Sequence, residues 1–126
     1  WEDEEELNLN KWAGVYIKRF DGPLFFGVAS KILERINKIP NDAKIIIFRM
    51  KHVPFIDQSG LYALEEVIKE MQKMDITVVL TMPHSQPLYL FRKNKLIPNI
   101  IPEKYVFKSI EDCALWLKEF SENAES

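Results

Sequence analysis

Three residues whose types could do chemistry stand together near the middle of the chain: Asp57, Ser59 and Gly60. They follow residues 44–50, an apolar and β-branched run typical of a buried strand, and they open residues 59–74, whose apolar spacing is typical of a helix. At a helix N-terminus the backbone N–H groups lack partners within the helix, and the helix dipole is positive. A hydroxyl or carboxylate there can cap the helix, or the hydroxyl can carry a phosphate beside those donors. Both interpretations stay open at this point.

A serine at a strand-to-helix turn also suggests a catalytic nucleophile, with His52 and His84 available as bases. The nucleophile-elbow pattern, however, needs a glycine two residues before the serine, and that position is Asp57. We therefore predict that the chain is not an enzyme, and we keep hydrolysis by Ser59 only as an outlier. Neither histidine has a cysteine at metal-ligand spacing, and the four glycines form no phosphate-binding loop, so no metal or cofactor is predicted.

Length and charge limit the number of domains and the classes of partner that the chain can have. The 126 residues suit one domain, which we place at residues 13–121, between an acidic tail at 1–12 and a C-terminal tail at 122–126. The net charge of -2 argues against nucleic acid as a partner, because that binding depends on lysine and arginine. The single cysteine, Cys113, favours a reducing compartment. The chain begins with Trp1 and not with Met, which we interpret as a domain taken from a longer protein, with a membrane region upstream left open.

The elements expected around the central turn alternate in type. Helices are predicted at residues 27–38, 59–74, 83–94 and 110–120, and strands at 15–20, 44–50, 76–81 and 105–107. Asp21-Gly22 suits a two-residue hairpin, with residues 23–26 as the returning strand. Ser109 and Asp112 have the spacing of a capping box. The prediction is an α/β fold: a mixed sheet of four or five strands, an opening β-hairpin and about four helices.

The segment Val53-Pro54-Phe55-Ile56-Asp57-Gln58-Ser59-Gly60-Leu61, between a strand and a helix, resembles the STAS domain. That family includes bacterial anti-sigma factor antagonists and the cytoplasmic C-terminal domains of SulP anion transporters, the sulfate permeases. The resemblance runs from about residue 15 to 120. Residues 22–29, Gly-Pro-Leu-Phe-Phe-Gly-Val-Ala, are similar to the transporter branch, whereas antagonists usually carry an acidic residue near Phe25 or Phe26.

The resemblance implies a function and a set of partners. In the antagonist branch a kinase phosphorylates the serine before the glycine, which is Ser59 here; Gln58 replaces the preceding serine of that motif. We expect a regulatory, protein-interaction domain of a SulP-type anion transporter at the cytoplasmic face of the membrane, with Ser59 as candidate phosphoacceptor and Pro54, Asp57, Gln58, Ser59 and Gly60 as its contact surface. Its expected partners are the transmembrane domain of the same chain, a cytoplasmic regulatory protein, a serine kinase and, through the full-length transporter, a second copy. The alternative is a stand-alone anti-sigma factor antagonist.

Overall fold

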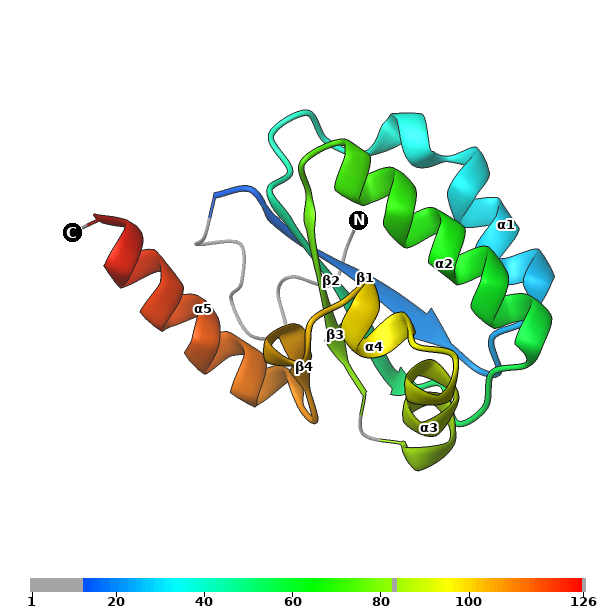
Figure 1. Ribbon diagram of the computed structural model, residues 1–126. Coiled ribbons are helices and arrows are strands. Elements are labelled where there is room, and N and C mark those ends of the chain that lie inside the picture. The colour runs from blue at the N-terminus through cyan, green and yellow to red at the C-terminus, as the bar shows by residue number, and fades with distance from the viewer. Residues whose placement is uncertain (1–12, 83, 126) are drawn as a thin grey trace.

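A computed structural model describes residues 13–82 and 84–125, and it shows one sheet with helices on both faces (Figure 1). The sheet has the strand order β1-β2-β3-β4. The strands are β1 (Val15–Asp21), β2 (Ile45–His52), β3 (Thr77–Thr81) and β4 (Val106–Phe107). The helices are α1 (Phe26–Glu34), α2 (Gln58–Lys73), α3 (Ser85–Lys93), α4 (Leu96–Asn99) and α5 (Ile110–Glu125), with 3-10 turns η3 (Ile36–Lys38) and η4 (Glu103–Tyr105). The predicted α/β class is confirmed; the acidic tail 1–12 lies outside the described residues.

The predicted opening hairpin is wrong. After β1 the chain turns at Gly22, whose φ is +80°, but the Gly22 N–H donates to the His52 carbonyl 2.8 Å away instead of starting a returning strand. Leu24 then makes a single parallel bridge to Ile56, and α1 begins two residues later. The local Asp-Gly signal is overridden because these backbone groups pair with the segment after β2. Every strand pairing in the described part of the chain is parallel, so the predicted mixed sheet is not seen there.

Strand β2 is central and buried on both faces, as its apolar run predicted. Ile46, Phe48 and Met50 point into a core shared with α1 and α2, while Ile45 and Ile47 point into a second core beneath α5. Figure 1 shows this layering, with α1 and α2 on one side of the sheet and α5 on the other. The alternation follows from the two-residue period of a strand.

Helix α5 closes the second face of the sheet. Ser109 Oγ accepts the Asp112 N–H at 3.1 Å, so the predicted serine cap is confirmed. Ile110, Cys113 and Leu117 pack into the second core, whereas Phe120 is half exposed. Burial raises the pKa of the Cys113 thiol to about 12. The helix continues to Glu125, into the segment that we set apart as a tail.

Helix α3 starts close to the predicted place. The N-cap residue is His84, which makes no side-chain cap bond. Gln86 is engaged elsewhere, with the backbone of Ile56. Across residues 13–82 and 84–125, no helix combines the length and the hydropathy needed to cross a bilayer.

Candidate functional site

The turn that carries Ser59 is held in place by two buried side chains and by hydrogen bonds to two other segments of the chain. Val53 and Ile56 are fully buried, so the backbone between β2 and α2 is anchored at two points. Gln86 of α3 donates to the Ile56 carbonyl at 3.2 Å and accepts the Ile56 N–H at 3.0 Å. The Phe55 carbonyl accepts the Leu24 N–H at 3.0 Å. These bonds hold three segments far apart in sequence around one short turn.

Asp57, and not Ser59, caps α2. Its Oδ1 accepts the Gly60 N–H at 2.6 Å, and its backbone is extended, as an N-cap residue requires. The carboxylate also lies at the positive end of the helix dipole. Because Asp57 supplies the cap, the exposed hydroxyl of Ser59 in the first turn is not the helix cap.

Gly60, which the sequence analysis placed on the contact surface, is buried in the first turn of α2. A Cβ built on Gly60 would lie 2.4 Å from the Leu24 carbonyl oxygen, closer than any side chain tolerates. The first turn of α2 therefore packs directly on the backbone that leads into α1. The absence of a side chain at Gly60 permits this close approach.

The surface around Ser59 combines polar and aromatic side chains. Pro54, Gln58 and Ser59 are exposed, and Asp57 is half-buried. Gln58 donates to Asn94 Oδ1 at 2.8 Å, which links α2 to the end of α3. Phe25 and Phe55, with 47% and 44% of their surface exposed, lie with ring centroids 6.4 Å apart. The sequence analysis singled out the polar residues of this surface but not the two aromatic rings.

The hydrolase hypothesis finds no support in the contacts of this turn. His84 Nε2 lies 2.7 Å from the Lys51 carbonyl oxygen, and His52 is exposed at the end of β2. Within residues 13–82 and 84–125, no hydrogen bond joins Ser59 to either histidine. An activated serine normally has a base within hydrogen-bond reach. The same residues contain no group of three or more His, Cys, Asp or Glu side chains able to hold a metal ion.

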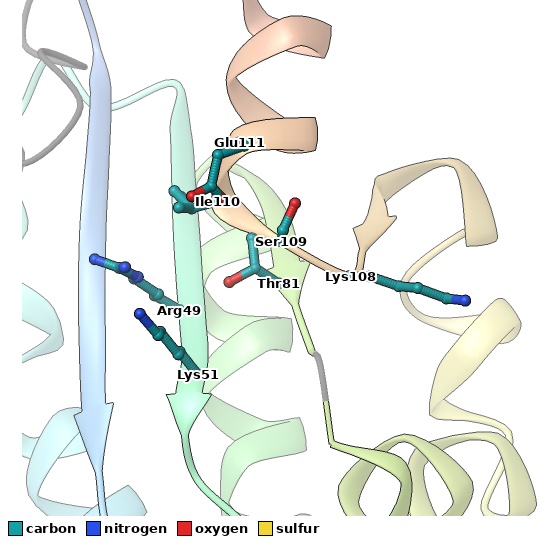
Figure 2. Close-up of a pocket in the computed structure, with 7 residues that line it drawn as sticks. All are labelled: Arg49, Lys51, Thr81, Lys108, Ser109, Ile110 and Glu111. Carbon is teal, nitrogen blue, oxygen red and sulfur yellow. The ribbon is translucent and has the colours of Figure 1, made fainter.

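A second polar cluster, which the sequence did not reveal, lies where β2 and β3 end near α5. It forms a cavity of about 160 Å³ lined by Arg49, Lys51, Thr81, Ser109 and neighbouring side chains (Figure 2). Arg49 is only 5% exposed and lies between Phe48 and Met50 in the apolar part of β2. Residues 44–50 carry two charges, Lys44 and Arg49, and the charge of Arg49 inside the apolar run was the available signal. The cavity-lining residues on β3 and at the start of α5 lie far from it in the sequence.

Comparison with known proteins places these features in one family. The STAS domain model matches residues 6–113. Among curated proteins, the chain is 26% identical over 114 residues to a probable sulfate permease of Schizosaccharomyces pombe, covering 77% of this chain and 17% of that protein. It is 29% identical over 112 residues to high affinity sulfate transporter 1 of Stylosanthes hamata, covering 79% of this chain and 16% of that protein. The chain thus spans about a sixth of the length of these relatives.

Two solved structures share the fold over most of both chains. One is a sulfate transporter family protein from Wolinella succinogenes, with a TM-score of 0.77, 29% identity and coverage of 86% of this chain and 88% of that one. The other is the STAS domain of a SulP transporter from Vibrio cholerae, with a TM-score of 0.72, 25% identity and coverage of 86% and 85%.

Proposed function

The chain belongs to the STAS domain family, and from this premise we propose that it is the cytoplasmic regulatory domain of a SulP-family anion transporter of the sulfate type. Support comes from the relatives: the two curated proteins described above are a sulfate permease and a sulfate transporter, and one structural neighbour is a SulP STAS domain. The transmembrane domain of the same transporter chain is then its first partner. These relatives favour the transporter hypothesis over a stand-alone anti-sigma factor antagonist.

We further propose that Ser59 is a phosphoacceptor whose modification regulates partner binding. The observation that carries this proposal is the exposed Ser59 in the first turn of a helix already capped by Asp57. A phosphate there adds about -1.5 to -2 charges beside helix N–H groups that favour an anion. The nearby Asp57 carboxylate opposes it. Since the turn is anchored by Val53 and Ile56, the surface changes charge while the backbone stays in place.

The proposed contact surface is Pro54, Asp57, Gln58 and Ser59, extended by the aromatic pair Phe25 and Phe55. Exposed aromatic rings supply much of the binding energy at protein interfaces. Phe55 lies four residues before Ser59 in the same turn, so we propose that one partner contacts both. The partners that this arrangement suits are a cytoplasmic regulatory protein and a serine kinase; dimerisation through the full-length transporter is also proposed.

Mass spectrometry of the full-length protein, purified from the cells that make it, tests the modification directly. Ser85 is a matched control, because it is also an exposed serine in the first turn of a helix. We expect phosphorylated peptides that contain Ser59 and none that contain Ser85. Full coverage of both sites without any modified Ser59 would overturn the phospho-switch.

Transport assays test the regulatory role. Sulfate uptake is measured in cells carrying the full-length protein with Ser59→Ala, Ser59→Glu, Ser85→Ala or Ser85→Glu. We expect the two Ser59 variants to differ from each other in uptake at equal surface abundance, and the two Ser85 variants to match the wild type. Equal uptake in all four variants would refute regulation through Ser59, and no sulfate uptake by the wild type would refute the transporter assignment.

A further inference from the structure

The sheet face beneath α5 changes character along β2. Ile45 and Ile47 are buried in the second core, and the next two residues on that face are Arg49 and Lys51. Arg49 lies in register with Thr81, the last residue of β3. Cationic and hydroxyl residues therefore lie in neighbouring positions near the carboxyl ends of adjacent parallel strands, the edge at which α/β folds commonly bind ligands.

These groups line the cavity of about 160 Å³ together with the start of α5. Figure 2 shows Arg49 and Lys51 extending from β2 toward β1, and the Thr81 hydroxyl directed from β3 toward β2. Ser109, which caps α5, and Glu111 in its first turn also line the cavity. The Asp112 N–H is bonded to Ser109 Oγ, and the backbone N–H groups of Ile110 and Glu111 precede any partner within the helix. Lys108 is also a lining residue, but its side chain extends away from the others.

The Thr81 hydroxyl is the most informative group in the cavity. The residue is 2% exposed, and Oγ1 has no hydrogen-bond partner among residues 13–82 and 84–125. Buried polar side chains nearly always have a partner, so one without any in the protein indicates a ligand or an ordered water. A hydroxyl can donate to an anion and fix its position, which lysine alone does not do.

We infer that this cavity binds a small tetrahedral oxyanion, sulfate or inorganic phosphate, held by Lys51 and Thr81, with the positive charge of Arg49 in the lining of the same cavity. Guanidinium, ammonium and hydroxyl donors beside a helix N-terminus form the usual set for such an anion. The cavity is below the roughly 300–1,000 Å³ of sites for larger organic ligands, which favours a compact ion. The negative charge of the Glu111 carboxylate repels the anion and lowers the affinity of the cavity for it. The inference does not depend on Ser59 or on the transporter assignment.

Amide chemical shifts measured by NMR on the 126-residue chain test the site. Sodium sulfate and sodium phosphate are titrated separately, against sodium chloride at matched ionic strength. We expect saturable shifts at Thr81, Ser109 and Glu111 with sulfate, phosphate or both, and no saturation with chloride. A preference for one oxyanion identifies the ligand. Shifts that stay linear, or that chloride reproduces, would overturn the inference.

Paired variants separate binding from folding. Thr81→Val should weaken binding roughly tenfold, the loss expected for one hydrogen bond to a charged group, without lowering the melting temperature. Lys51→Gln should weaken binding, whereas Lys31→Gln, at an exposed site on α1, should not. Unchanged affinity in both Thr81→Val and Lys51→Gln would overturn the site.

Glu111, the acidic residue that lines the cavity, provides a test in which the affinity should increase instead of decrease. Glu111→Gln removes a carboxylate that lines the cavity and should tighten binding several-fold by the removal of like-charge repulsion. Glu119→Gln, an exposed position farther along α5, is the control and should leave the affinity unchanged. Tightening by Glu119→Gln as large as that by Glu111→Gln would reduce the effect to net charge and count against a defined site.

Discussion

Replacing Gly60 with alanine tests the close approach that sets the position of α2. In the native chain the new Cβ would lie 2.4 Å from the Leu24 carbonyl oxygen and 3.0 Å from Asp57 Oδ1, whereas ordinary contacts begin at 3.4 Å. Relieving the first contact therefore takes a shift of about 1.0 Å (3.4 minus 2.4). The Leu24 backbone cannot easily yield, because its N–H is bonded to the Phe55 carbonyl and its side chain is 1% exposed.

The expected size follows from two opposing effects. Overpacking of this kind costs about 3 kcal/mol, at the upper end of the usual range. Alanine is favoured over glycine in a helix by about 1 kcal/mol. We therefore expect Gly60→Ala to lower the free energy of unfolding by about 2 kcal/mol, which corresponds to about 8 °C in melting temperature for a chain of this length.

Gly27→Ala is the matched control, since Gly27 also lies in the first turn of a helix but has no neighbouring atom within 4 Å of the place that an alanine Cβ would take. It should leave stability unchanged or raise it by up to about 1 kcal/mol. Urea unfolding followed by circular dichroism measures both, with equal m-values showing that the unfolded states are comparable. A Gly60→Ala variant as stable as Gly27→Ala would refute the argument from close packing.

Two further predictions concern the cap and the thiol. Asp57→Ala should cost about 1 kcal/mol of unfolding free energy in the same urea assay, while Asp57→Asn retains most of the cap; equal losses would show that charge and not capping matters. Burial raises the Cys113 pKa from 9.0 to about 12, so between these values the unfolded chain loses a proton that the folded chain keeps. Stability should therefore fall above pH 9 by up to about 1.4 kcal/mol per pH unit, more steeply than in Cys113→Ala; parallel pH profiles for the two proteins would contradict this.

The parts of the fold that could be predicted are those encoded within one segment. Residues 44–50 and 59–74 showed a buried strand and an amphipathic helix, and β2 and α2 follow them within two residues. The hairpin at Asp21-Gly22 failed because the decisive partner, His52, lies 30 residues later in the chain. No local pattern can show which strand a turn will join.

In the candidate site, too, the features encoded in one segment could be predicted and those that depend on distant residues could not. The sequence located the helix start, yet both Asp57 and Ser59 suit a cap, and only the 2.6 Å bond to Gly60 distinguishes them. Arg49 appeared to be one charge in an apolar strand. Its position beside Thr81 arises from strand register, which is a property of the assembled sheet.

The bonds from Gln86 to both backbone groups of Ile56 have a consequence for recognition. A turn held at its centre by a neighbouring helix has little conformational entropy left to lose when another molecule settles on it. The backbone of Phe55, directly before Ile56, is thus already in the conformation that a binding partner would contact. A partner should therefore bind at this turn with little change in its backbone conformation, and shape and charge should determine which partners bind.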